Sequence, residues 1–171
     1  SCSIGIEIVN PGHDFDYPDF PRRQIAAVIA LCRSVFTRHQ IPADRILAHS
    51  DIAPARKKDP GEKFPWRLLH DSGVGMWVKP APIVAGSGRI FVLGDRDPEV
   101  ETLQMSLRSL GYGLQKTGSY DAETMAVVAA FQRHYRPARV DGIADVSTVA
   151  TLQALLTARE PRAAGLPKPR K

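Results

Sequence analysis

The sequence lacks long apolar runs and has little cysteine. No stretch approaches the roughly 20 apolar residues that cross a bilayer, and the start does not show the basic, apolar and small-residue regions of a secretory signal. Cys2 and Cys32 are the two cysteines in 171 residues, and neither lies in a Cys-x-x-Cys spacing. These absences exclude a transmembrane helix in this sequence, a dense disulfide framework and a cysteine-based metal site. We expect both cysteines to be buried thiols.

Acidic residues are missing from the end of the chain, where positive charge is concentrated. The last eleven residues carry four basic side chains and no acid, and removing those four from the formal net charge of +5 leaves +1. A nucleic-acid-binding protein would instead spread basic residues over a folded face. We therefore expect no nucleic-acid partner, and we interpret residues 159–171 as a disordered basic tail.

Apolar patterning at the start of the chain predicts a strand followed by a helix. In residues 3–9 three isoleucines alternate with other residues, which predicts a strand with Glu7 on the face opposite the isoleucines. After a loop, apolar residues recur at helical spacing from Pro21 to about His39. A natural protein seldom begins directly in a strand. We therefore interpret the chain as a fragment or processed product, whose compartment does not follow from the missing signal.

Two further elements complete the first unit. A short strand is predicted over residues 45–48 and a terminal helix over residues 67–77. Strand, helix and strand in that order indicate a layered α/β architecture. Residues 1–77 are therefore predicted to form an α/β unit, a partial mixed sheet with flanking helices.

The patterning changes in the second part of the chain. Residues 78–90 are rich in Pro, Gly and Ser and are interpreted as a linker. Amphipathic helices are then predicted near residues 100–110, 124–135 and 148–156. A Gly-x-x-Asp-x-x-Thr string occurs twice, 24 residues apart, each time before a predicted helix. Because two copies are too few for a solenoid, residues 91–158 are predicted to form a small all-α three-helix domain.

An irregular loop from His49 to about Trp66 carries residues suited to metal-dependent hydrolysis. A hydrolytic zinc uses about three protein ligands of the His or carboxylate type, and His49 and Asp59 could supply two of them. Glu7 could act as general base, and Lys57 could stabilise an oxyanion on the attacked carbonyl. Spacing alone leaves other interpretations open: a structural histidine, an ordinary Asp-Pro-Gly turn, and solvated charges.

The strings SIGIEIVNPG and HSDIAPARKKDPGEKFPW resemble the type 2 N-acetylmuramoyl-L-alanine amidases, a zinc amidase family related to peptidoglycan recognition proteins. The resemblance covers the first unit and implies that His49 and Asp59 bind zinc. Glu7 would then act as general base and Lys57 would assist the transition state. Asn10, in the first string, is predicted to contact the substrate.

One departure concerns the first zinc ligand of such enzymes, a histidine that precedes the strand carrying the general base. This sequence has no residues at that place, so the resemblance implies that a segment upstream of this chain completes the site. His13, in the loop after the strand, is the alternative ligand. The other histidines are interpreted as surface or packing residues: His39, His70 and His134.

The second unit resembles the peptidoglycan-binding domain type 1, a three-helix module attached to many wall-active enzymes. The resemblance is carried by Leu103-Gln104, Leu110-Gly111-Tyr112, Phe131-Gln132 and the two Gly-x-x-Asp-x-x-Thr strings. Most of these residues are expected to serve the fold, with Asp121 and Asp145 organising turns. The resemblance implies a tethering role, because weak wall binding raises the local concentration of an enzyme on an insoluble substrate.

Together the two resemblances imply a Zn2+-dependent amidase that hydrolyses the bond between N-acetylmuramic acid and L-alanine. Its expected partner is peptidoglycan or a muropeptide, its expected site of action is the periplasm or cell envelope, and a monomer is expected. Two alternatives stay open: a cytoplasmic amidase that recycles anhydro-muropeptides, and a recognition protein without catalysis.

Overall fold

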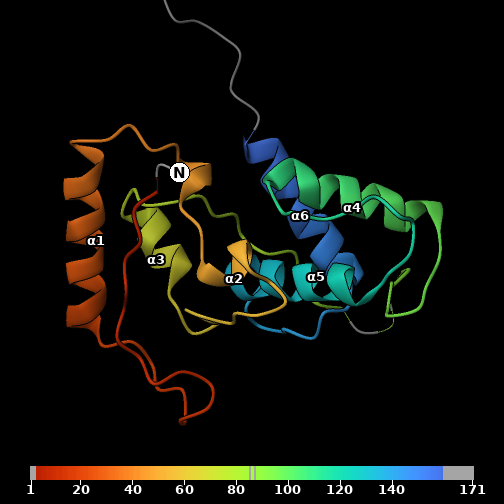
Figure 1. Cartoon of the computed structure of the whole chain (residues 1–171), viewed down its shortest axis with the longest axis horizontal. Coiled ribbons are helices and arrows are strands. Elements are labelled where there is room, and N and C mark those ends of the chain that lie inside the picture. Colours follow the sequence, from red (N-terminus) through yellow and green to blue (C-terminus); the bar gives the residue numbers. More distant parts are fainter. Residues whose placement is uncertain (1–2, 85, 87, 160–171) are drawn as a thin grey trace, which may run out of the picture.

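The computed structural model describes residues 3–84, 86 and 88–159, which form helices joined by loops (Figure 1). In chain order the elements are α1 (Arg22–Phe36), the 3₁₀ helix η1 (Ala43–Arg45), α2 (His49–Ile52), α3 (Trp66–Asp71), α4 (Pro98–Leu110), α5 (Ala122–Tyr135) and α6 (Val146–Arg159). We call residues 3–77 the N-terminal half and residues 91–159 the C-terminal half. Over the described residues, no helix has the length and apolar character that crossing a bilayer requires.

The predicted helix after Pro21 forms as α1 and ends at Phe36 instead of His39. Its apolar stripe faces inward, and the helix buries Ile25, Val28, Cys32 and Val35. The stripe packs against Phe64, Trp66 and Leu69, which come from the long loop and α3. The predicted terminal helix is shorter than expected, since α3 ends at Asp71. Cys32 is a buried thiol as predicted, whereas Cys2 lies outside the described residues.

The predicted mixed sheet is not confirmed. Residues 3–9 run as irregular chain along α1, and residues 45–48 lead from η1 into α2 (Figure 1). Among the described residues, β pairing is confined to two isolated bridges, Phe91 with Ala144 and Arg96 with Ser119. Alternation in a sequence identifies the two faces of a strand, but a strand also needs a neighbour that accepts and donates its backbone hydrogen bonds.

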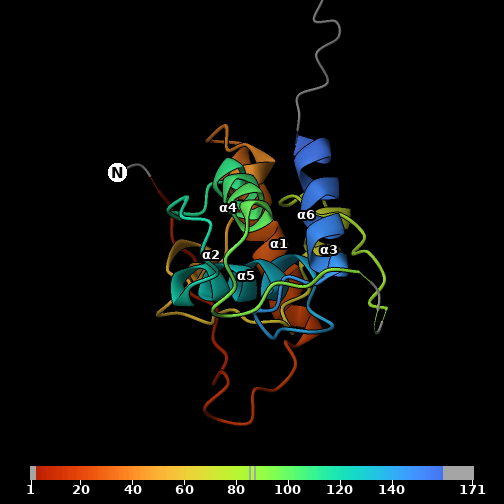
Figure 2. The same cartoon turned by 90° about the vertical axis from the view of Figure 1, so that its right-hand side faces the viewer.

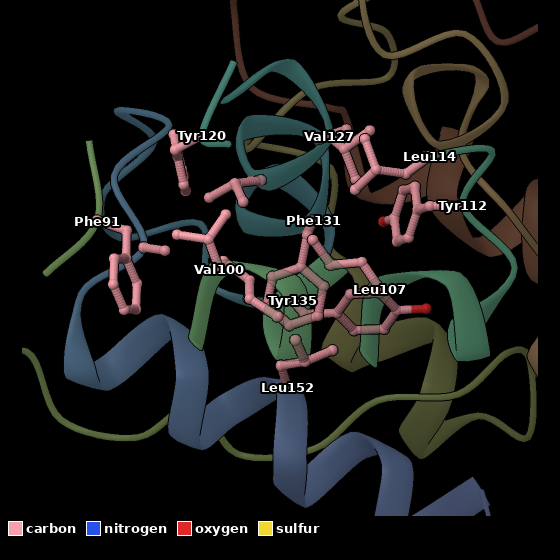
Figure 3. Close-up of a cluster of buried hydrophobic side chains, with 14 of the residues drawn as sticks. Phe91, Val100, Leu107, Tyr112, Leu114, Tyr120, Val127, Phe131, Tyr135 and Leu152 are labelled. Atoms are coloured by element: carbon pink, nitrogen blue, oxygen red, sulfur yellow. The ribbon is translucent and has the colours of Figure 1, made fainter. Parts of the chain in front are cut away.

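The three predicted helices of the C-terminal half form as α4, α5 and α6. Figure 3 shows side chains from all three helices directed into one cluster, among them Leu107, Phe131 and Leu152. Phe131 and Leu152 are 0% exposed, so this core is closed to solvent. Gly111, with a positive φ of 111°, ends α4 in the left-handed conformation that favours glycine.

The repeated string forms two equivalent turns. The Asp121 carboxylate accepts hydrogen bonds from the backbone N–H and the hydroxyl of Thr124, both at 2.8 Å, and thereby caps α5. Asp145 accepts the same two bonds from Thr148, both at 2.7 Å, at the start of α6. The helix before each turn supplies a buried glutamine, Gln104 or Gln132, that bonds to the turn's backbone. These glutamine bonds explain why glutamine accompanies the repeat.

Gln132 illustrates this arrangement. Its Oε1 accepts from the N–H groups of Asp141 and Gly142, and its Nε2 donates to the Ile143 carbonyl and the Thr148 hydroxyl. Gln104 makes the matching contacts around Gly118. Each amide therefore satisfies both ends of its side chain inside the protein.

The two halves contact each other at several places. Trp77 packs against both apolar cores. Ala81 lies on α6, where its N–H donates to the Thr151 hydroxyl at 3.0 Å and its carbonyl accepts from the Ser147 hydroxyl at 2.7 Å. At the end of α6, Arg159 Nε donates to the carboxylate of Asp44 in η1 at 2.8 Å. The predicted tail from residue 160 onward lies outside the described residues.

The most buried contact joins α2 to α5, which lie side by side in Figures 1 and 2. Asp51 of α2 is 7% exposed and meets His134 of α5 and Tyr112 of the loop after α4. The segment 78–84 is irregular in structure, yet these contacts hold the two halves against each other.

Candidate active site

The structure brings the two predicted zinc ligands together. Nδ1 of His49 lies 3.0 Å from Oδ2 of Asp59, and the two side chains are 47% and 60% exposed. His49 begins α2, while Asp59 follows ten residues later in the loop. The backbone N–H of Ser50 donates to the carbonyl of Asp59 at 3.0 Å, which fastens the loop beside α2. The convergence of these side chains therefore depends on a main-chain contact as well as on their own interaction.

Tyr17 holds the loop that carries Asp59. Its hydroxyl donates to the Pro60 carbonyl at 2.6 Å and accepts from the Lys63 N–H at 3.0 Å. Burial raises the pKa of Tyr17 to about 12, so the hydroxyl stays a donor at neutral pH. Gly61, at a positive φ of 85°, lies so close to this ring that a side chain there would collide with it. The sequence patterning did not single out Tyr17, since its contacts are with residues more than 40 positions away.

A groove of about 550 Å³ lies between residues 3–8 and α1. Four of the predicted site residues line it: Glu7, Asn10, His49 and Asp59. Glu7 is exposed, and the rest of the lining is largely apolar. The groove is thus mostly apolar, and the Glu7 carboxylate and the His49–Asp59 pair are among its polar lining groups.

Asn10 lines the groove, whereas Lys57 does not. Lys57 is half-buried, its backbone N–H donates to the Ala53 carbonyl at 2.9 Å, and it is not among the residues that line the groove. Asn10 lines the groove and also orders its own loop, because its Nδ2 donates to the Pro18 carbonyl and its Oδ1 accepts from the Gly12 N–H. Four of the five predicted site residues therefore line the same groove.

His13, the alternative zinc ligand, is engaged elsewhere. Its Nε2 lies 3.0 Å from the Glu62 carboxylate, and its ring stacks on Tyr17 with centroids 4.2 Å apart. Burial would raise the pKa of Glu62, but hydrogen bonds from its own backbone N–H and from His13 outweigh burial and lower it. His13 borders the groove, yet its polar partner is Glu62.

The donor atoms of His49 and Asp59 are of the types that bind zinc. An imidazole nitrogen and a carboxylate oxygen are both preferred zinc ligands, and their convergence at the groove fits such an ion. Over the described residues, no group of three or more His, Cys, Asp and Glu side chains converges on one point. The pair therefore fits two places of a zinc site, which would need a further donor.

Sequence comparisons distinguish the two halves. Residues 1–62 match the N-acetylmuramoyl-L-alanine amidase family. The first part of the chain is therefore similar to this amidase family. Residues 96–152 match the peptidoglycan binding domain family, in agreement with the three-helix fold of the C-terminal half. The chain therefore joins a segment that matches the amidase family to one that matches the peptidoglycan binding domain family.

Curated relatives agree with the amidase match. The chain is 36% identical over 163 residues to the N-acetylmuramoyl-L-alanine amidase AmiD of Escherichia coli (strain K12), a match that covers 90% of this chain and 56% of AmiD. It is 38% identical over 68 residues to the 1,6-anhydro-N-acetylmuramyl-L-alanine amidase AmpD of Enterobacter cloacae, covering 40% of this chain and 34% of AmpD. The chain thus spans about half the length of AmiD and about a third of AmpD.

Solved structures show the same fold. The E. coli AmiD complex with anhydro-N-acetylmuramic acid-L-Ala-D-gamma-Glu-L-Lys matches with a TM-score of 0.68 at 33% identity, covering 84% of this chain and 55% of AmiD. Pseudomonas aeruginosa AmpDh3 in complex with an anhydromuramic pentapeptide matches with a TM-score of 0.71 at 33% identity, covering 91% of this chain and 62% of AmpDh3. Because both matches extend over most of this chain, they include the C-terminal half as well as the amidase segment.

Proposed function

We propose that this chain takes part in zinc-dependent hydrolysis of the amide bond between N-acetylmuramic acid and L-alanine in peptidoglycan. The observation that carries the proposal is the 3.0 Å contact between His49 and Asp59, which both line the groove. The two solved relatives support the substrate class, since each is described in complex with an anhydro-muropeptide.

His49 and Asp59 would hold the zinc ion through Nδ1 or Nε2 and through a carboxylate oxygen. When bound, zinc lowers the pKa of its water toward about 7 and polarises the scissile carbonyl. Glu7, on the same groove, would accept the proton of the attacking water and deliver it to the leaving nitrogen of L-alanine. Lys57 would stabilise negative charge on the carbonyl oxygen, and Asn10 would contact the substrate beside Glu7.

The third zinc ligand is proposed to be a histidine upstream of residue 1. The described residues offer no third donor at the pair, which supports this assignment. The proposed upstream segment would also supply the missing neighbour for residues 3–9, whose Ile4 and Val9 are 53% and 87% exposed. In that arrangement residues 3–9 and 45–48 would be strands of a mixed sheet, with Glu7 on the face opposite the isoleucines.

The cell envelope is the proposed site of action, where the C-terminal half would bind the wall. Contacts between the halves support this assignment, because they hold a peptidoglycan-binding module directly against the amidase segment. The competing possibility is recycling of soluble anhydro-muropeptides in the cytoplasm. Assays on intact sacculi and on soluble muropeptides separate the two: cleavage of sacculi supports wall remodelling, whereas activity on fragments alone supports recycling.

Glu7→Gln tests the mechanism in the protein extended upstream to include the third ligand. The amide keeps the shape of the side chain but cannot accept the proton, so turnover is expected to fall on the order of 100- to 10,000-fold with bound zinc unchanged. Release of the L-alanyl peptide is followed by chromatography and mass spectrometry, and zinc by elemental analysis. Glu123→Gln, the same change on the exposed start of α5, serves as control.

Near-normal turnover of Glu7→Gln would remove Glu7 as the base. Chelation of the metal is expected to abolish hydrolysis, and added Zn2+ to restore it. If the extended protein bound the muropeptide but held no zinc, the alternative of a recognition protein without catalysis would replace the proposal.

A further inference from the structure

A buried polar cluster joins the C-terminal half to the turn that carries His49. The Asp51 carboxylate lies 2.6 Å from Nδ1 of His134 through its Oδ2, and its Oδ1 accepts a hydrogen bond from the Tyr112 hydroxyl at 2.7 Å. The side chains of His134 and Asp51 are 1% and 3% exposed. A carboxylate so deeply buried needs such partners, because leaving it unpaired would be strongly unfavourable.

The His134 ring stacks on aromatic rings from both halves. It stacks on Trp66, the first residue of α3, with centroids 3.8 Å apart, and on its neighbour Tyr135 with centroids also 3.8 Å apart. Nε2 of the ring is buried and has no hydrogen-bond partner among the described residues. The contact from Nδ1 to Asp51 is thus the polar interaction that fixes the ring's direction.

Asp51 in turn fixes the first turn of α2. Its Oδ2 accepts from the backbone N–H of Ala48 at 2.8 Å, directly before His49. With four residues, α2 is too short to hold its shape without tertiary contacts. The same turn presents the Ser50 N–H to Asp59, so its conformation decides whether His49 and Asp59 meet.

We infer that His134 and Tyr112 are positioning residues for the zinc site, acting through Asp51 on the placement of His49. The inference rests on the proposed function, which makes His49 a zinc ligand. It gives the C-terminal half a second role besides wall binding: it holds one wall of the catalytic centre in place. Placement matters because displacements near 1 Å at a reacting centre can lower rates by about 100-fold.

Tyr112→Phe is the first test, since it removes one hydroxyl and leaves the ring in place. The Ser50 amide, which bonds to Asp59, is expected to exchange its hydrogen about tenfold faster, the loss expected for one hydrogen bond. Exchange is measured by NMR on the metal-free full chain, with amides of α6 as the internal reference. Tyr120→Phe is the matched control, because it removes a buried hydroxyl that bonds to Gly142 within the C-terminal half.

His134→Phe removes the ring nitrogen while keeping a flat side chain between Trp66 and Tyr135, and the same faster exchange at Ser50 is expected. His134→Asn, whose side-chain N–H can replace Nδ1, is expected to restore protection in part. In the extended protein, zinc affinity measured by chelator competition is expected to fall about tenfold in Tyr112→Phe and in His134→Phe, the lower end for outer-sphere partners of a metal ligand. Tyr120→Phe should leave that affinity unchanged.

Unchanged Ser50 exchange and unchanged zinc affinity in a folded Tyr112→Phe would overturn the inference. Equal effects from Tyr120→Phe would overturn it as well, because they would indicate general destabilisation. The exchange measurement is independent of zinc and of hydrolysis. If the wild-type extended protein proved to bind no zinc, the proposed function would fail while Ser50 exchange still decided whether the C-terminal half orders α2.

Discussion

The N-terminal and C-terminal halves differ in how completely they cover their own apolar side chains. Phe131 and Leu152 in the C-terminal half are 0% exposed, whereas Ile4 and Val9 in the N-terminal half are 53% and 87% exposed. The groove of about 550 Å³ between residues 3–8 and α1 belongs to the N-terminal half. The C-terminal half closes a core from three local helices, while the N-terminal half depends on contacts from outside itself.

The two halves also differ in where their buried polar side chains find hydrogen-bond partners. The Gln132 side chain finds its partners inside the C-terminal half, in a turn 9 to 16 residues away. Asp51, in the N-terminal half, takes partners from Tyr112 and His134, which lie 61 and 83 positions further along the chain. Local repeats therefore stabilise one half, and long-range contacts stabilise the other.

Among the predictions that test this difference between the halves, Phe131→Ala is expected to cause the largest loss in the free energy of unfolding. Removing a fully buried ring leaves a cavity, and the free energy of unfolding should fall by about 3–5 kcal/mol. Val9→Ala in the exposed segment should change it by less than about 0.5 kcal/mol. Both are measured by urea unfolding monitored by circular dichroism. A large loss in Val9→Ala would show that residues 3–9 are better packed than their exposure indicates.

The next largest effect is expected at alkaline pH, where ionisation of the buried tyrosines lowers the stability of the fold. Burial raises the pKa of all four tyrosines, to about 12 for Tyr17 and further for Tyr112, Tyr120 and Tyr135. A raised pKa contributes stability below the unfolded value near 10 and loses it as the pH rises toward the folded value. For Tyr17 this stability is therefore lost between about pH 10 and about pH 12.

Ultraviolet absorbance of tyrosinate measures this titration. In the native protein no tyrosine should ionise near pH 10, and Tyr17 of the N-terminal half should ionise first, near pH 12 or on unfolding. In urea all four should titrate near pH 10. A tyrosine that titrates near pH 10 in the folded chain would contradict the burial of that ring.

Asp121→Ala is expected to have the smallest effect of the three. It removes the cap of α5, and the free energy of unfolding should fall by about 1 kcal/mol. Asp71→Ala at the end of α3 removes an exposed carboxylate that pairs with Arg67 on the same helix, which should change it by only about 0.3–0.5 kcal/mol. Urea unfolding of both variants makes the comparison. Equal losses would mean that capping contributes no more than an exposed pair.

Sequence patterning predicted the elements whose stabilising contacts are local. The apolar stripe of α1 and the capping aspartates of α5 and α6 are each visible within a few residues, and all three helices formed close to their predicted bounds. Glu7, His49 and Asp59 were found through two motifs that resemble a known family, and the structure brings all three to one groove. Their catalytic and zinc-binding roles stay predictions.

The contacts that patterning missed join residues far apart in the sequence. His134 was expected to be a surface or packing residue, and it does pack in the interior, but its contact with the Asp51 carboxylate was not predicted. Nothing in the periodicity of α5 marks it, because an inward histidine occupies the same helical position as any apolar residue. Alternation in residues 3–9 likewise predicted a strand without revealing whether a neighbouring strand is there to pair with it.

The shared carboxylate at position 51 also limits how these modules can be recombined. A C-terminal module joined only by a flexible connection would impose no demand on the segment it accompanies. Here a grafted module would have to present a hydroxyl and a ring nitrogen where Tyr112 and His134 present theirs, or it would leave a negative charge without compensation. We therefore expect chimeras that exchange only the C-terminal module to fold less well than chimeras that carry both sides of this contact.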